Sequence, residues 1–231
     1  MGQFGLASAA AVGGVVNVTS ILIVDDHDLV RTGLKNILGD SGDIELVGEA
    51  STGEEAIRLA RQLEPDVILM DVGLPGLSGL ETTERILKSQ PDIRVIVLTA
   101  HSEPPLPARL LDIGATGYLT KACDARELVN AVRTVARGER YIGADIAQQL
   151  AISLLPGTPQ SPFQELTARE LEIALMLTQG MKMPSIAEVI NVSPKTVATY
   201  KYRIYEKVGV NSEVELLRMA LRHGLVSAEP G

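Results

Sequence analysis

The sequence has a single cysteine, Cys123, and no apolar run that is long and uninterrupted enough to span a bilayer. One cysteine excludes an internal disulfide and offers no spacing for a cysteine metal site. A chain without disulfides suits a reducing compartment. We therefore expect a cytoplasmic protein with no membrane insertion.

The chain also lacks an excess of positive charge. Its 21 Lys and Arg residues face 29 Asp and Glu residues, which gives a net charge of −8 and argues against indiscriminate binding to polyanions. Basic residues are also missing before the small apolar stretch at residues 5–12, so we reject a secretory signal there. We expect residues 1–17 to form a flexible extension.

The length of 231 residues, of which 45% are hydrophobic, allows two small domains with packed cores. Pro and Gly residues break every apolar periodicity in residues 155–162, as expected of an interdomain linker. We expect a first domain at residues 18–140, a linker at 141–162 and a second domain at 163–231.

Acidic residues follow two short, branched apolar runs that are typical of strands buried on both faces. Asp25 and Asp26 follow residues 20–24, and Asp71 follows residues 67–70. In an open α/β sheet the carboxyl ends of the strands share one edge, where these carboxylates would repel one another without a cation. Mg²⁺ prefers such oxygen ligands. The simpler alternative is that the acids only cap strand ends.

Two further predicted strands end in groups suited to phosphoryl oxygens. Residues 94–98 precede Thr99, and residues 117–119 are followed closely by Lys121. A hydroxyl and an ammonium beside a carboxylate can hold a phosphoryl group placed on Asp71. The set indicates a nucleophile, its metal ligands and a charge clamp.

These segments resemble a response-regulator receiver domain over roughly residues 18–140. The motifs that carry the match are Ile23-Val24-Asp25-Asp26-His27, Met70-Asp71-Val72-Gly73-Leu74-Pro75-Gly76, Leu98-Thr99-Ala100 and Gly117-Tyr118-Leu119-Thr120-Lys121. The resemblance implies that Asp71 is the phosphoacceptor. It implies metal ligation by Asp25, Asp26, Asp71 and the Gly73 backbone carbonyl. It also implies a switch hydroxyl, a switch aromatic residue and a phosphoryl-binding lysine, which are Thr99, Tyr118 and Lys121.

Helical apolar patterns alternate with the predicted strands. This alternation predicts an α/β domain in which right-handed crossovers build a five-stranded parallel sheet covered on both faces, as in the flavodoxin-like receiver fold. A last receiver helix is expected at residues 124–136.

Beyond the linker the chain becomes helical. Thr167 and Glu170 have the spacing of a capping box, and Ser193-Pro194 is a strong helix start. Helices are expected at residues 167–178, 184–190, 194–208 and 213–222. The two helices on either side of Asn191-Val192-Ser193 indicate a helix-turn-helix in an all-α domain.

Charge alone leaves the role of this second domain open. It carries equal numbers of basic and acidic residues, although the helix from Pro194 is basic. A basic helix is often only a solvated face. The charge pattern therefore does not decide between a solvated helix and a DNA-binding helix.

The motifs of this domain resemble the LuxR-type helix-turn-helix of the NarL/FixJ response regulators. They are Leu166-Thr167-Ala168-Arg169-Glu170, Ile186-Ala187, Val192-Ser193-Pro194-Lys195-Thr196-Val197 and Lys207-Val208-Gly209-Val210. The resemblance places the helix from Pro194 in the major groove of double-stranded DNA. It implies phosphate and groove-edge contacts by Lys195, Thr196, Lys201 and Arg203, and base-facing positions for Ala198, Thr199 and Tyr202. A lysine that is frequent at the position of Ala198 is absent.

Both domains together look most similar to the GacA/UvrY subgroup, through residues 27–33, 108–111 and 200–204. The resemblance implies a two-component transcriptional activator that takes its phosphoryl group from a membrane histidine kinase, with promoters of small regulatory RNAs as typical targets. It implies a homodimer on DNA when phosphorylated. It further implies no dedicated enzyme, but a receiver that promotes its own phosphotransfer and dephosphorylation.

Two rivals from other classes stay open. An aspartyl-phosphate hydrolase would also use an Asp nucleophile and Mg²⁺, but Gly73 fills the likeliest place for its second acid. A ligand-gated LuxR-type regulator would share the DNA-binding domain, but it gives no reason for the cluster of Asp25, Asp26 and Asp71.

Overall fold

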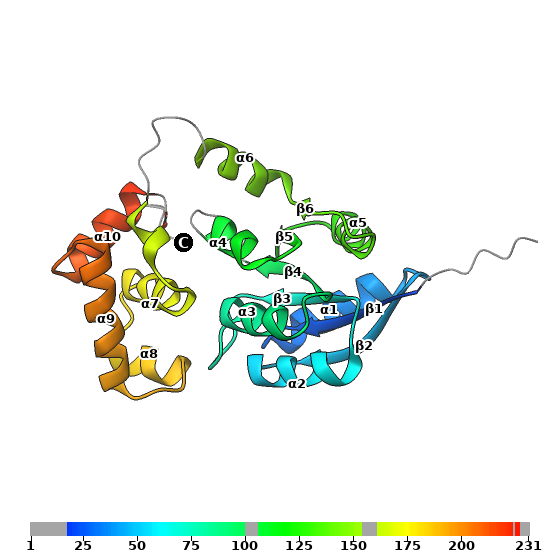
Figure 1. Ribbon diagram of the computed structural model, residues 1–231, viewed down its shortest axis with the longest axis horizontal. Helices are drawn as coiled ribbons and strands as arrows, with labels where there is room; N and C mark the ends of the chain where they lie inside the picture. Colours follow the sequence, from blue (N-terminus) through cyan, green and yellow to red (C-terminus); the bar gives the residue numbers. More distant parts are fainter. Residues whose placement is uncertain (1–17, 100–105, 154–160, 224, 227–231) are drawn as a thin grey trace, which may run out of the picture.

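A computed structural model describes residues 18–99, 106–153, 161–223 and 225–226. The extension expected at residues 1–17 lies outside this part of the chain. The described residues form an α/β unit followed by a helical unit (Figure 1). No helix of the described residues combines the length and the apolar character that crossing a membrane requires.

A parallel sheet forms the centre of the first unit, with the strand order β2-β1-β3-β4-β5-β6. Its strands are β1 (Thr19–Val24), β2 (Ile44–Ala50), β3 (Val67–Asp71), β4 (Arg94–Thr99), β5 (Gly117–Thr120) and β6 (Tyr141–Ile142). The expected sheet had five strands. The sixth, β6, pairs with β5 at the sheet edge, and its two residues are too few to show any alternation in the sequence.

Helices cover both faces of this sheet (Figure 1). Those of the first unit are α1 (Asp28–Gly39), α2 (Gly53–Leu63), α3 (Gly79–Ser89), α4 (Leu106–Ile113), α5 (Ala125–Ala136) and α6 (Ala144–Ser153). Successive strand residues point to opposite faces, so Ile21 and Ile23 join the core under α1 and α5, while Leu22 and Val24 join the core under α2 and α3. All four are buried. Two apolar layers therefore hold the strand ends in place.

The segment assigned to the linker begins with ordered elements. Residues 141–153 include β6 and α6, and Ile146 of α6 is buried in the core. Helix α6 thus packs against the first unit through Ile146. How the chain divides into domains stays a prediction.

The second unit consists of η1 (Pro162–Glu165), α7 (Ala168–Thr178), α8 (Met183–Val189), α9 (Pro194–Val208) and α10 (Glu213–Arg222). The predicted capping box is confirmed, since the Glu170 amide donates to Thr167 Oγ1 and the Thr167 amide donates to Glu170 Oε2. Helix α9 begins at Pro194 after the Ser193 cap, and it ends at Val208 before the capping residue Gly209, whose φ of +77° favours glycine. The four predicted helices therefore form within one residue of their expected bounds.

Candidate phosphoacceptor site and nucleic-acid interface

The acids predicted to meet at the sheet edge do meet there. Asp71 ends β3 and is 4% exposed, and Asp25 directly follows β1 and is 1% exposed. Ligand atoms of Asp25, Asp26, His27 and Asp71 lie within 4.8 Å of one another. Residues that are far apart in sequence thus form one acidic cluster, because β1 and β3 are neighbouring parallel strands.

Lys121 joins this cluster from the end of β5. Its Nζ lies 2.7 Å from Asp25 Oδ2 and 2.9 Å from Asp71 Oδ2, so one ammonium bridges both buried carboxylates. Burial raises the pKa of Asp71 above its ordinary value even though Lys121 and the Gly73 amide act in the opposite direction. Burial lowers the pKa of Lys121, but its hydrogen bonds to Asp25 and Asp71 outweigh burial and raise it overall. The lysine therefore stays charged.

The cluster fits a hard cation. Asp26 Oδ1 is shielded from solvent and accepts no hydrogen bond from the described residues, although His27 Nδ1 lies 2.8 Å away. A buried carboxylate oxygen without a hydrogen-bond partner is costly unless it has another electropositive neighbour. Carboxylate oxygens are the ligands that Mg²⁺ prefers. The residues present therefore suit a divalent ion of this kind, and Lys121 alone does not satisfy Asp26.

The predicted switch pair lies behind the cluster. Thr99 ends β4 and is 1% exposed, and Tyr118 of β5 is fully buried and hydrogen-bonded to Thr99. Burial raises the pKa of Tyr118 far above its ordinary value, which keeps the phenol neutral. A hydroxyl at a strand end is thus linked to an aromatic ring inside the core.

The loop after Asp71 approaches that residue closely. A Cβ at Gly79, the first residue of α3, would lie 1.8 Å from the Asp71 carbonyl oxygen, so a side chain there would force the start of α3 away from Asp71. Gly76, with a φ of +75°, turns the same loop. The Gly73 amide donates to Asp71, so Gly73, whose carbonyl the resemblance assigns to the metal, lies beside the cluster.

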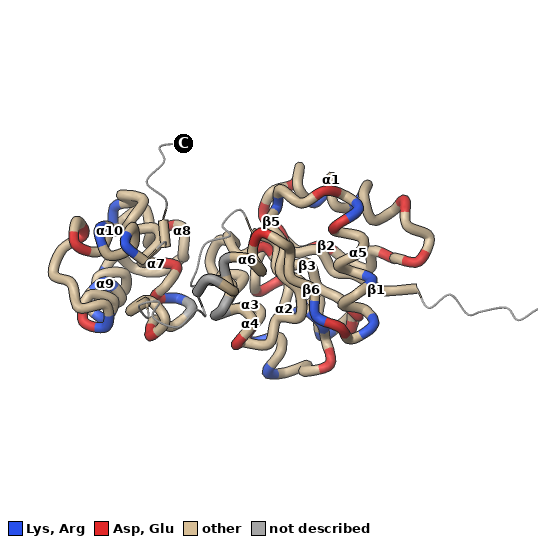
Figure 2. The backbone as a smooth tube through the Cα atoms, turned by 90° about the horizontal axis from the view of Figure 1, so that it is seen from above, with Lys and Arg blue, Asp and Glu red and all other residues tan. Residues whose placement is uncertain are grey.

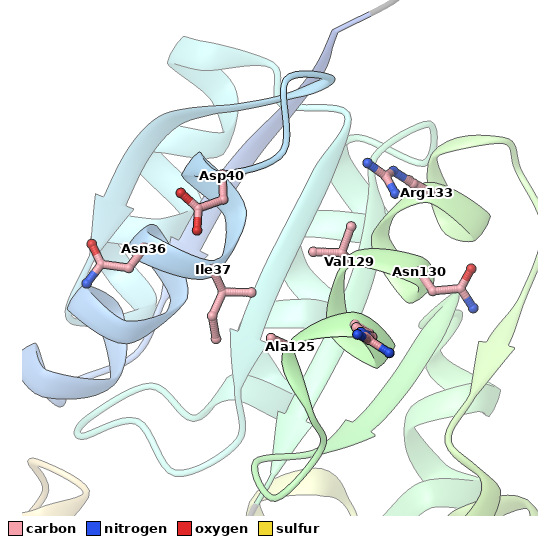
Figure 3. Close-up of a pocket in the computed structure, with 8 residues that line it drawn as sticks. Asn36, Ile37, Asp40, Ala125, Val129, Asn130 and Arg133 are labelled. Carbon is pink, nitrogen blue, oxygen red and sulfur yellow. The ribbon is translucent and has the colours of Figure 1, made fainter.

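A separate groove runs between α1 and α5 (Figure 3). Its lining residues are Asn36, Ile37, Asp40, Ala125, Arg126, Val129, Asn130 and Arg133. None of them belongs to the acidic cluster. The groove is therefore distinct from the candidate phosphoryl site.

Helix α9 presents the predicted nucleic-acid residues unevenly. Lys195, Ala198, Thr199 and Tyr202 are exposed and follow the spacing of one helix face, with Tyr202 at 70% exposure. Arg203 is also exposed, whereas Thr196 is half-buried at the Ser193 cap. Lys and Arg residues are interspersed with acids over both units (Figure 2). The exposed face of α9 is thus recognised by the helical spacing of its exposed residues, and not by a broad basic patch.

Lys201 is held away from the middle of this face. Its Nζ lies 2.6 Å from Glu213 Oε1 at the start of α10 and 5.5 Å from the centre of the Tyr205 ring. The resemblance implies a phosphate contact for Lys201, whereas nothing in the sequence pattern predicts its pairing with Glu213. Glu213 directly follows the Ser212 cap, which can be read from the sequence, but the contact itself depends on how the chain between α9 and α10 turns.

Two family models match the chain. One is described as the response regulator receiver domain and matches residues 21–133, and the other as bacterial regulatory proteins of the luxR family and matches residues 164–220. The two matches cover the acidic cluster and helix α9, respectively.

Known relatives match almost the full chain. It is 51% identical to the response regulator GacA of Pseudomonas aeruginosa over 209 residues, which is 90% of this chain and 98% of the relative. It is 49% identical to the response regulator UvrY of Escherichia coli K12 over 211 residues, which is 91% of this chain and 97% of the relative. The RcsB response regulator of Salmonella typhimurium shares the fold, with a TM-score of 0.68 and 24% identity over 87% of this chain and 96% of that chain.

Proposed function

The chain belongs to the response regulators that join a receiver domain to a LuxR-type DNA-binding domain, close to GacA and UvrY, and we propose that it takes a phosphoryl group onto Asp71. Matches across both halves favour this class over a stand-alone hydrolase and over a ligand-gated regulator. The observation that carries the proposal is the convergence of two buried carboxylates and one ammonium at the carboxyl end of β3.

Phosphotransfer from a phosphohistidine requires an ionised carboxylate and a stabilised phosphoryl group. An oxygen of Asp71 attacks phosphorus, a P–O bond forms, the P–N bond breaks and the imidazole leaves as a neutral ring after protonation. Lys121 favours the ionised form of Asp71 before transfer and afterwards can pair with a phosphoryl oxygen. A Mg²⁺ ion bound by Asp25, Asp26, Asp71 and the Gly73 carbonyl would neutralise the added phosphoryl charge. The Thr99 hydroxyl would donate a hydrogen bond to another phosphoryl oxygen.

On this basis the receiver promotes its own phosphotransfer and dephosphorylation in the cytoplasm, and the partner is a membrane sensor histidine kinase. The second partner is promoter DNA, read by the exposed residues of α9. The exposed apolar residues of α10, Val214, Leu217 and Leu221, supply a surface for a homodimer on a two-fold operator. The protein then acts as a transcriptional activator, as the resemblance to the GacA/UvrY subgroup implies.

Incubation with acetyl phosphate and Mg²⁺, followed by intact mass measurement, tests the phosphoacceptor. The wild type should gain one acid-labile phosphoryl group, and Asp71→Asn should gain none while its circular dichroism is unchanged. Asp92→Asn is the matched control, because Asp92 is an exposed acid at the opposite end of the sheet. Full incorporation into Asp71→Asn would end the assignment.

The same samples test the coupling to DNA. Phosphorylated wild type should bind a two-fold operator more tightly than the unphosphorylated protein in fluorescence anisotropy, because pairing of two copies adds the second half-site. Equal affinity of both forms over a wide protein concentration range would show that phosphorylation does not control DNA binding.

A further inference from the structure

The loop that follows Asp71 is in contact with the DNA-binding domain. The Gly76 amide donates a hydrogen bond of 2.9 Å to the carbonyl oxygen of Val189, the last residue of α8. Buried residues of the sheet face under α3 and buried residues of α7 to α10 belong to one continuous apolar cluster. Helices α3 and α7 lie next to each other in this arrangement (Figure 1). The receiver thus docks the second domain directly beyond the phosphoacceptor.

A carboxylate lies buried at this junction. Glu172 of α7 is 7% exposed and accepts a hydrogen bond from Ser78, the residue that caps α3. Arg169 Nη1 lies 3.2 Å from Glu172 Oε2, while Arg169 Nη2 donates to the Ile190 carbonyl oxygen at 2.8 Å. Ser78 is itself 2% exposed. An ionisable group of the DNA-binding domain is therefore enclosed partly by receiver residues.

Arg169 and Glu81 act on Glu172 in opposite directions. Arg169 on its own helix favours the carboxylate, whereas Glu81 of α3 faces it from the receiver and disfavours it. Burial is the largest influence and raises the pKa of Glu172 to about 7. Separation of the domains would remove Ser78 and Glu81 and admit water, so the pKa would return towards its ordinary value of 4.5.

We propose that the receiver surface formed by Gly76, Ser78 and Glu81 docks the DNA-binding domain through Glu172, and that docking takes up a proton at this carboxyl group. The inference goes beyond phosphorylation at Asp71 and depends only on the presence of both domains in one chain.

The direction of the pH dependence follows from the raised pKa of Glu172 in the docked state. A group whose pKa is higher in the docked state stabilises docking most fully below its undocked pKa, and this contribution is lost as the pH rises through the docked pKa. With docked and undocked values of about 7 and 4.5, the docking constant should rise about tenfold between pH 8 and pH 6.

Docking in this form does not cover the DNA-reading face. Lys195, Thr199 and Tyr202 remain exposed while α7 and α8 contact the receiver. Proton uptake would therefore change how freely the DNA-binding domain moves relative to its receiver. It would not block access of DNA to α9.

Small-angle X-ray scattering of the full, unphosphorylated chain at pH 6, 7 and 8 tests the proposal without phosphodonor or DNA, so its failure is distinct from failure of the proposed function. The wild type should become more compact as the pH falls. Glu172→Gln, which stays uncharged, should be equally compact at all three values. Glu188→Gln, which changes an exposed acid of α8, should behave like the wild type.

A second variant keeps the test decisive if Glu172→Gln disturbs the fold of α7. Glu81→Gln lies in the receiver and removes the like charge, so compaction should require a lower pH than in the wild type. A wild-type scattering curve that does not change between pH 6 and pH 8 overturns the proposal. An unshifted transition in Glu81→Gln, or a wild-type response in a folded Glu172→Gln, overturns it as well.

Discussion

Two lysines of this chain have the same exposure and opposite surroundings. The side chains of Lys121 and Lys201 are both 24% exposed. Lys121 bridges Asp25 and Asp71, whose side chains are 1% and 6% exposed, whereas Lys201 pairs with Glu213, whose side chain is 53% exposed. The exposure of the partner carboxylate, rather than of the lysine, therefore distinguishes the proposed phosphoacceptor site from the surface of the DNA-binding domain.

This difference determines what each lysine does. Two buried carboxylates repel each other in a medium that screens poorly, so the ammonium between them is required by the fold as well as by the chemistry. An ion pair with an exposed carboxylate is weak, since water replaces either partner readily. Lys201 is thus free to exchange Glu213 for a phosphate, while Lys121 is released only when another positive group enters the cluster.

The largest expected effect is the loss of stability when Lys121 is replaced. Lys121→Met should lower the free energy of unfolding by about 3 kcal/mol at pH 8 in the presence of a chelator, since it leaves two buried carboxylates without a counter-charge. Lys201→Met removes a lysine of equal exposure and should cost at most about 1 kcal/mol. Urea unfolding followed by circular dichroism measures both. Equal losses in the two variants would contradict the comparison.

The pH dependence of Lys121→Met sharpens this test. Burial already raises the pKa of Asp71, and loss of the ammonium should raise it further. The contribution of a carboxyl group with a raised folded pKa is complete below its unfolded value and is lost as the pH rises through the folded value. The deficit of Lys121→Met relative to the wild type should therefore shrink between pH 8 and pH 5.

A second prediction concerns the carboxylate that Lys121 does not reach. Asp26→Ala should reduce the rate of Mg²⁺-dependent phosphorylation by roughly 100-fold, because loss of a ligand should weaken metal binding at least as much as loss of a supporting contact does. Intact mass measurements over a Mg²⁺ titration give the rate and the metal dependence together. Asp28→Ala, at an exposed acid of α1, is the control. Undiminished phosphorylation of Asp26→Ala, or of the wild type in excess chelator, would contradict the site.

The acidic cluster could be predicted from the sequence because it follows from regular structure. Asp25 and Asp71 come directly after apolar runs, and parallel pairing of β1 with β3 brings such ends together whatever the loops do. The same holds for Thr167 and Glu170, since a capping box is local in sequence. Residue spacing therefore predicts these contacts, because regular strand pairing and helix capping fix which residues meet.

Contacts that depend on packing between elements could not be predicted in this way. Glu172 meets Ser78 only because α7 lies on α3, and Lys201 meets Glu213 only because the chain after α9 brings the start of α10 beside Lys201. Exposed acids and lysines are common, and no periodicity selects one pair among them. Strand β6 was missed for another reason, since its two residues are too short for a pattern.

The smallest expected effect tests whether Lys201 exchanges partners on DNA. Glu213→Gln should raise the affinity for operator DNA about two- to threefold at low salt, the factor that corresponds to a surface ion pair of about 0.5 kcal/mol, because Lys201 no longer has to leave an acid. Lys201→Met should weaken binding to all sequences and reduce the salt slope by roughly one unit. In the double variant the gain from Glu213→Gln should disappear, since no lysine remains to be released.

Fluorescence anisotropy over a salt titration measures all of these variants. Glu206→Gln removes an exposed acid of α9 without freeing Lys201, so any gain it gives reports general repulsion of DNA and should persist when Lys201 is methionine. A gain from Glu213→Gln that also persists in the Lys201→Met background would show that Glu213 acts by repulsion alone. Lys201 would then only link α9 to the start of α10 through its ion pair with Glu213. The ion pairs of Lys201 and Lys121 would differ in strength, and Lys201 would not exchange Glu213 for a DNA phosphate.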